Sequence, residues 1–279
     1  MTFLIVVLIL CVIYLWLIHP RMNGEMRRTC RRLARHNFAH RGLWSKAACV
    51  PENSMEAFRR AADAGYGIEL DVQQTADGHL VVFHDDDLFR LCRMEGTIAE
   101  KTLDELADLR LAGTGHGIPL LSSVLKLVNG CVPLLIEIKL PTKDTEMCRH
   151  VRDMLLEYPG DYLIESFNPF GVRWFRKNTI GIPVGQLAAR YMPEDKNSSM
   201  LKFLSTTLMM NTVSRPDFVA YDCRFTDVIG FRLNWKLFRT PVFVWTVRSE
   251  KEYAEFSEIY DGIIFERFRP PACKGEDQA

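Results

Sequence analysis

The chain has 279 residues, of which 48% are apolar and 25% are charged, a balance that excludes an intrinsically disordered protein. This length is enough to bury the core of one large domain. The formal net charge is zero, but residues 1–35 contain six arginines and one glutamate, net +5, which leaves −5 on the remaining 244 residues. A mildly acidic body offers no general surface for nucleic acid, so we expect no nucleic-acid partner.

The first eighteen residues, MTFLIVVLILCVIYLWLI, contain no charged side chain. A helix of this length covers roughly 27 Å, close to the hydrocarbon thickness of a bilayer. An arginine-rich segment follows immediately, and positive charge on that side favours a cytoplasmic location for the rest of the chain. We therefore predict a single-pass protein of the cell membrane, with a transmembrane anchor at residues 1–19 and a basic juxtamembrane linker at residues 20–35.

Two alternatives to the anchor stay open. A cleaved signal peptide is disfavoured, because no basic region precedes the apolar stretch and no small-residue cleavage site follows it. The other alternative is an interfacial helix, held partly by the arginines on anionic lipid. The eight cysteines form no CxxC pair, as expected of thiols in a reducing compartment.

From Asn37 onward, apolar runs rich in β-formers alternate with amphipathic helical patterns. Eight runs are predicted strands: residues 37–42, 67–72, 132–140, 161–167, 182–189, 217–223, 241–247 and 260–266. Predicted helices occupy residues 54–64, 145–157, 170–177, 196–212, 228–238 and 250–258. This alternation predicts an α/β fold, a parallel sheet closed as a (β/α)₈ TIM-type barrel over residues 36–270, with a polar tail at residues 271–279.

Residues 73–129 interrupt the alternation with a strand, HLVVFHD, and two helical patterns. The turn ADGH has the Asp-Gly signature of a tight hairpin. Pairing outward from that turn sets Asp71 opposite His84, although a slip of one residue stays open. We predict a hairpin-plus-helix excursion after the second strand, on the face that holds the strand ends.

Acidic side chains interrupt the second and third predicted barrel strands, and active sites of such barrels gather at the C-terminal strand ends. Glu69 and Asp71 share one strand face, and Glu137 lies on the neighbouring strand. Carboxylates this close repel unless a proton or a cation lies between them. Oxygen ligands favour Mg²⁺ or Ca²⁺, so we predict a divalent-cation site. The alternative is a metal-free polar layer, paired with Arg41 and Lys139.

Two histidines converge on the same strand ends. His40 ends the first strand, and His84 returns through the hairpin. Histidine is the side chain best matched to proton transfer at neutral pH, and Arg41 and Lys139 supply positive charge for a phosphate group. The arrangement predicts metal-assisted cleavage of a phosphodiester by two histidines.

The stretch PENS, residues 51–54, lies before the first predicted barrel helix. Glu52 lies just outside that helix, and we predict that it reaches the site. Asn53, with Glu56 three residues later, fits a helix N-cap, and a role in the site is the alternative.

Seven separated motifs resemble, in order and spacing, those of the glycerophosphodiester phosphodiesterase family. They are AHRG, PENSMEAF, GIELDVQQTADGHLVVFHDDDLFRL, LLIEIK, ESFNP, FVWTV and DGIIFE. The resemblance implies hydrolysis of glycerophosphodiesters to glycerol 3-phosphate and an alcohol, with an essential divalent cation, Mg²⁺ or Ca²⁺. It also implies that the glycerol 2-hydroxyl attacks phosphorus and that water then opens a cyclic phosphate.

The resemblance also implies roles for single residues. His40 and His84 are then the general acid and base, Arg41 and Lys139 bind phosphate, and Trp245 packs against glycerol, unless it only fills the barrel top. Glu69, Asp71 and Glu137 hold the metal, and Glu266 is the only match to a frequent acidic pair after the last strand. The partner is then a small phosphodiester or a lysolipid head group. Three alternatives stay open: a lysophospholipase D, a lyase that releases the cyclic phosphate, and a catalytically silent, membrane-tethered module that binds phosphorylated head groups.

Overall fold

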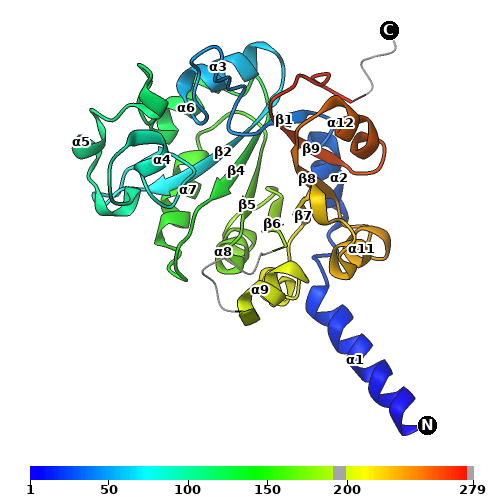
Figure 1. The fold of residues 1–279 in the computed structure, drawn as a ribbon. Coiled ribbons are helices and arrows are strands. Elements are labelled where there is room, and N and C mark those ends of the chain that lie inside the picture. Colours follow the sequence, from blue (N-terminus) through cyan, green and yellow to red (C-terminus); the bar gives the residue numbers. More distant parts are fainter. Residues whose placement is uncertain (191–198, 275–279) are drawn as a thin grey trace.

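Eight parallel strands close into a barrel in the computed structural model, which describes residues 1–190 and 199–274 (Figure 1). The strands are β1 Asn37–Ala39, β2 Gly67–Gln74, β4 Leu134–Ile138, β5 Tyr162–Ser166, β6 Val184–Ala188, β7 Phe218–Asp222, β8 Val242–Val247 and β9 Gly262–Phe265. Strand β1 closes the barrel, because it pairs in parallel with both β2 and β9. The predicted TIM-type barrel is confirmed.

Helices surround the strands, and most of them pack apolar side chains against the outside of the barrel. They are α3 Met55–Asp63, α6 Leu121–Val128, α7 Glu146–Leu155, α8 Pro169–Asn178, α9 Ser199–Thr206, α10 Asn211–Ser214, α11 Ile229–Lys236 and α12 Glu250–Ser257. The helix predicted at residues 196–212 is divided into α9 and α10, with the buried Leu208 at a left-handed φ of 61° between them. Residues 196–198 of that prediction, and 275–279 of the predicted tail, lie outside the described residues.

The barrel interior is apolar at the end where the strands begin. Phe38, Phe218 and Phe243 fill it, with ring centroids 5.0–5.9 Å apart. Helix α2, Gly24–Leu33, contributes Cys30 and Leu33 to the same cluster. The segment predicted as a juxtamembrane linker is therefore a helix packed on the base of the barrel. Because apolar side chains fill this end, the polar residues of the strands lie at the opposite, C-terminal end.

The excursion after β2 forms as predicted. Strand β3, Leu80–Val82, pairs antiparallel with β2. It is followed by α4 Phe89–Cys92, η1 Ile98–Glu100, α5 Leu103–Leu106 and η2 Leu111–Gly113, which share a small apolar core.

The predicted register of this hairpin is wrong by one residue. Val72 pairs with Val82, and the amide of Phe83, not His84, bonds the carbonyl of Asp71 at 2.9 Å. The reason is the turn, because the Thr75 amide bonds the His79 carbonyl at 2.9 Å, which makes a three-residue loop. Gly78 completes this loop with a φ of 88°, which glycine adopts without steric cost.

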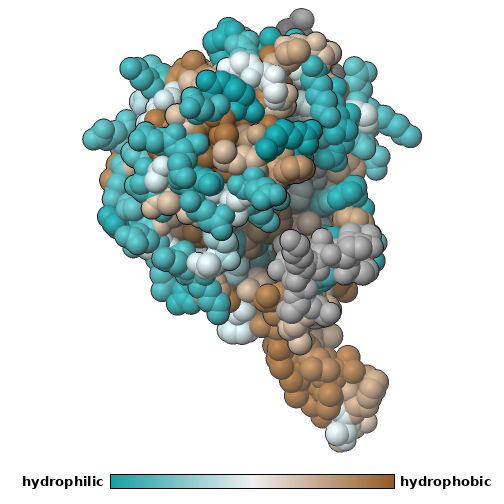
Figure 2. Space-filling model, turned by 60° about the vertical axis from the view of Figure 1, so that its left-hand side comes forward, coloured by the Kyte–Doolittle hydropathy of each residue, from teal (hydrophilic) through white to brown (hydrophobic). Residues whose placement is uncertain are grey.

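Helix α1, Thr2–Ile18, projects from the barrel with apolar side chains exposed around it (Figures 1 and 2). Its last turn packs on the barrel, where Ile18 is fully buried and its carbonyl accepts a hydrogen bond from Asn211. With 17 residues, the helix is about 26 Å long, and part of that length is used against the barrel. Within residues 1–190 and 199–274, no helix is long and apolar enough to cross a membrane. The predicted transmembrane anchor is therefore not supported.

Candidate active site

A pocket of about 110 Å³ opens at the C-terminal ends of the strands. Its walls include six of the nine predicted site residues: His40, Arg41, Glu69, His84, Glu137 and Trp245. The other three, Glu52, Asp71 and Lys139, are ion-paired with members of this wall or with one another. The tertiary structure therefore brings all nine predicted residues to one place.

The three predicted metal ligands form one buried cluster. Asp71 and Glu137 are register partners on β2 and β4, and Glu69 points to the same side of β2 as Asp71. Each offers a carboxylate oxygen, and these oxygens all lie within 4.8 Å of one another. No more than 6% of any of the three residues is exposed. This oxygen-only donor set fits a hard divalent cation.

The electrostatics of the cluster favour the binding of positive charge. Burial, then the neighbouring Asp71, raises the pKa of Glu69 well above its usual range. Burial also raises the pKa of Glu137 to about 7. Carboxyl groups with raised pKa values either bind a proton or are stabilised as carboxylates by a cation. The residues present thus fit the predicted metal.

Basic side chains also contact the cluster, as the metal-free alternative requires. The Lys139 ammonium lies 3.1 Å from Oδ1 of Asp71 and 2.9 Å from Oε1 of Glu137. Burial lowers the pKa of Lys139, but these two carboxylates outweigh it and hold that pKa above its usual value. The backbone amide of Arg41 donates to Oε2 of Glu69 at 2.8 Å, and Nε of Arg41 lies 3.6 Å from Asp71.

Each of the two histidines is paired with a carboxylate through Nδ1. His40 Nδ1 lies 3.0 Å from Oε2 of Glu266, and His84 Nδ1 lies 2.7 Å from Oδ1 of Asp85. Burial raises the pKa values of both carboxyl groups, but hydrogen bonds from the histidines and from arginines outweigh it. The pKa of Glu266 falls to about 2, and that of Asp85 falls below its usual value. An ionised carboxylate only accepts hydrogen bonds, so Nδ1 carries the proton and Nε2 is left for proton transfer.

Glu52 contacts Arg41 instead of the pocket itself. Its carboxylate accepts a hydrogen bond from the Arg41 guanidinium and a second one, at 2.7 Å, from Arg90. Arg90 also bonds Asp85, the partner of His84, at 2.9 Å. Glu52 therefore orients a phosphate-binding candidate and connects it to the histidine of the hairpin.

The N-cap interpretation of Asn53 is wrong. Ser54 caps α3, because its hydroxyl accepts a hydrogen bond from the Ala57 amide at 3.2 Å. Asn53 is fully buried at a left-handed φ of 54°, which asparagine tolerates better than most residues. Its side-chain amide donates to Oδ2 of Asp71 at 2.8 Å. Asn53 thus holds a predicted metal ligand, the alternative that the sequence left open.

Several residues of the site escaped sequence reasoning. Glu165 on β5 is the register partner of Glu137, is 1% exposed, and lines the pocket. Its Oε2 has no hydrogen-bond partner among the described residues. The sequence pattern could have indicated Glu165, because it is an acidic residue in the apolar run DYLIESF, as Glu69, Asp71 and Glu137 are in the second and third predicted strands. Asp85 and Arg90 gave no such signal, since Asp85 lies in the acidic run after β3 and Arg90 in the single turn of α4.

One wall of the pocket is apolar. The Trp245 ring meets Phe167 edge-on, with centroids 5.8 Å apart, and Leu187 and Ile264 continue the surface. Such a wall suits the carbon skeleton of a small polyol, while the opposite side presents charged groups.

Residues 40–268 match the model of the glycerophosphoryl diester phosphodiesterase family. A glycerophosphodiester phosphodiesterase of Caldanaerobacter subterraneus is 35% identical over 164 residues, which cover 53% of this chain and 65% of the relative. One from Bacillus altitudinis is 37% identical over 133 residues, 44% of this chain and 47% of the relative. The chain thus spans about half to two thirds of the length of these relatives.

Solved structures give the same fold. A glycerophosphodiester phosphodiesterase of Thermotoga maritima superposes with a TM-score of 0.60 at 26% identity, over 82% of this chain and 92% of that one. A phosphodiesterase of Oleispira antarctica, in complex with the product sn-glycerol-3-phosphate, superposes with a TM-score of 0.67 at 22% identity. The match covers 85% of this chain and 94% of that one. Because the family model matches most of the barrel, the chain belongs to the glycerophosphoryl diester phosphodiesterase family.

Proposed function

We propose that the chain hydrolyses glycerophosphodiesters to glycerol 3-phosphate and an alcohol. One observation carries the proposal: two histidines, each paired through Nδ1 with an ionised carboxylate, line the same pocket as the buried carboxylate cluster. Family membership supports it, as does the product sn-glycerol-3-phosphate in the related Oleispira antarctica protein.

In this proposal, the charged groups receive the phosphodiester. Arg41 and Lys139 neutralise its negative charge, and the apolar wall at Trp245 receives the glycerol carbon atoms. Glu69, Asp71 and Glu137 would hold Mg²⁺ or Ca²⁺. The bound cation would supply further positive charge against the phosphate.

The two histidines transfer protons through Nε2. Burial lowers the pKa of His40 to about 4, so this imidazole is neutral at pH 7 and is able to accept a proton. We assign the base role to His40, which accepts the proton of the hydroxyl that attacks phosphorus. We assign the acid role to His84, which donates a proton to the oxygen of the leaving alcohol. Acid–base groups of this kind contribute about 10²–10⁴ in rate.

Phosphorus NMR of the products tests the proposal. The panel contains glycerophosphocholine, glycerophosphoethanolamine, glycerophosphoglycerol and lysolipids, each with Mg²⁺ and with Ca²⁺. Glycerol 3-phosphate as the final product supports the proposal. Accumulation of cyclic glycerol phosphate would identify a lyase, release of lysophosphatidic acid a lysophospholipase D, and no turnover with any compound a silent binding module.

A further inference from the structure

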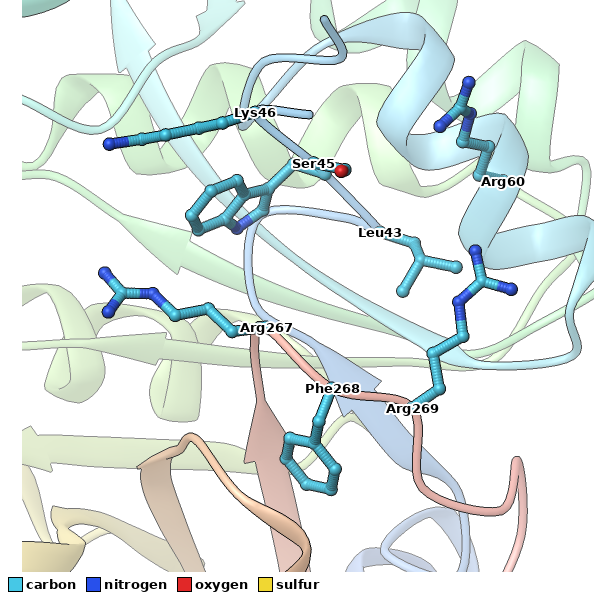
Figure 3. Close-up of a pocket in the computed structure, with 8 residues that line it drawn as sticks. Leu43, Ser45, Lys46, Arg60, Arg267, Phe268 and Arg269 are labelled. Carbon is cyan, nitrogen blue, oxygen red and sulfur yellow. The ribbon is translucent and has the colours of Figure 1, made fainter. Parts of the chain in front are cut away.

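A second cavity, of about 530 Å³, lies between the loop after β1 and the loop after β9 (Figure 3). We call it the basic cavity; it is lined by Leu43, Trp44, Ser45 and Lys46, by Arg60 of α3, and by Arg267, Phe268 and Arg269. It shares no lining residue with the catalytic pocket.

Four of the lining side chains are cationic and none is acidic. Arg60 bonds Glu56 at 2.8 Å, and Arg267 lies 3.3 Å from Glu266. Within residues 1–190 and 199–274, neither Lys46 nor Arg269 forms an ion pair within 4.0 Å. The cavity therefore has an excess of positive charge that the described part of the chain only partly neutralises.

The arrangement of these cations suits an anion. In Figure 3, Arg60 and Arg269 lie towards one side of the cavity, and Lys46 and Arg267 extend towards the other. Lys46, Arg267 and Arg269 are exposed and Arg60 is partly buried, so their charged groups are accessible from solvent, and guanidinium groups match the oxygens of phosphate in geometry and charge. Trp44 and Phe268 add aromatic walls.

One carboxylate separates the basic cavity from the catalytic pocket. Oε2 of Glu266 lies 3.0 Å from His40 Nδ1, and Oε1 of the same carboxylate lies 3.3 Å from Nε of Arg267. The loop after β1 likewise passes from Arg41 in the pocket to Leu43 in the cavity within two residues. The two spaces are therefore close enough for one extended molecule to reach both.

We propose that the basic cavity binds a phosphate group other than the phosphodiester that is cleaved. Two sources have this chemistry: a second phosphate on the leaving alcohol, or free inorganic phosphate. The first source rests on the proposed function, because it makes the cavity a specificity site for substrates whose leaving alcohol is itself phosphorylated.

A matched pair of substrates tests the first source. Glycerophosphoglycerol and glycerophosphoglycerol phosphate differ by one phosphate on the leaving alcohol. We expect the native protein to have the higher kcat/KM for the phosphorylated compound, and Arg60→Gln and Arg269→Gln each to reduce this preference about tenfold or more. Turnover of glycerophosphoglycerol stays unchanged in both variants, because neither residue contacts the catalytic pocket.

Arg59→Gln is the matched control. Arg59 lies on the same helix as Arg60 and pairs with the same Glu56, but it does not line the cavity. If the cavity causes the preference for the phosphorylated substrate, the Arg59→Gln variant should keep that preference. Circular dichroism checks that all variants fold.

Calorimetric titration with inorganic phosphate, in EDTA, tests the binding itself without turnover. We expect the Arg60→Gln/Arg269→Gln double variant to bind one phosphate fewer than the native protein and the Arg59→Gln control. Loss of this phosphate with an unchanged substrate preference would identify free phosphate as the ligand. Equal phosphate binding and equal preference in all proteins would overturn the proposal. If neither substrate is turned over, the proposed function fails, and the titration still decides whether the cavity binds phosphate.

Discussion

His40, directly after β1, and Glu266, directly after β9, are 226 residues apart in sequence, yet Nδ1 of the histidine lies 3.0 Å from Oε2 of the glutamate. They meet because β1 and β9 are neighbours in the closed barrel. The same carboxylate accepts a hydrogen bond from Arg248 at 2.7 Å, so each of its two oxygens has a partner that stabilises its negative charge.

Glu266→Gln tests the orientation of His40. The amide keeps a hydrogen-bond acceptor but loses the charge that stabilises the protonated imidazole, so we expect a loss of about ten- to a hundredfold in kcat. The Glu266 carboxylate raises the pKa of His40, so the variant should also shift the acid limb of kcat/KM to lower pH. Glu255→Gln, at an exposed position of α12, is the control. An unchanged pH profile would contradict the role of Glu266.

His40→Ala and His84→Ala test the two proposed proton-transfer groups. Each variant should lose at least about two orders of magnitude in turnover, in keeping with general acid–base catalysis. His79→Ala, in the turn of the same hairpin as His84, should keep native activity, because His79 does not line the pocket. Steady-state rates for folded variants decide the question, and near-native turnover of both would exclude the histidine mechanism.

Metal removal should abolish activity reversibly, and thermal melts give a second readout that needs no turnover. In EDTA, at a pH high enough to ionise the native Glu69 carboxyl, Glu69→Gln should melt at a higher temperature than the native protein, because it removes one buried charge from a cluster of like charges. Added Mg²⁺ or Ca²⁺ should stabilise the native protein but have little effect on the variant. Equal stabilisation of both proteins by the ion would exclude Glu69 as a ligand.

Asp217, which is fully buried, predicts a pH dependence of stability. Burial raises its pKa to about 6 from the usual 3.8, so the folded protein binds more protons between these values than the unfolded chain does. The free energy of unfolding should therefore fall as pH rises from about 4 to 6, by up to about 3 kcal/mol. Asp217→Asn keeps an acceptor for the Val184 amide and should remove the contribution of Asp217 to this dependence. Melting curves of the two proteins across this range check it, and parallel profiles would contradict the assignment.

Several residues of the candidate site could be predicted from the sequence because they are charged residues within apolar runs. Glu69, Asp71 and Glu137 stand out in apolar strands, and side-chain alternation places the first two on one face. Glu165 carried the same signal and was missed. Asp85 and Arg90 carried none, because charged residues are ordinary in a loop and in a short surface helix, and only the folded excursion brings them to His84.

The order of strands and helices, and with it the barrel, could be predicted from the sequence, because burial on both faces of a parallel strand requires a continuous apolar run. The sequence also indicated most of the charged side chains that gather at the candidate site, because charged groups in such runs are costly unless paired. Three features became visible in the folded chain alone: the Glu266 partner of His40, the hairpin register, and the packing of the last turn of α1 on the barrel. These features depend on contacts between residues far apart in the chain and on the geometry of one turn, and neither has a local pattern.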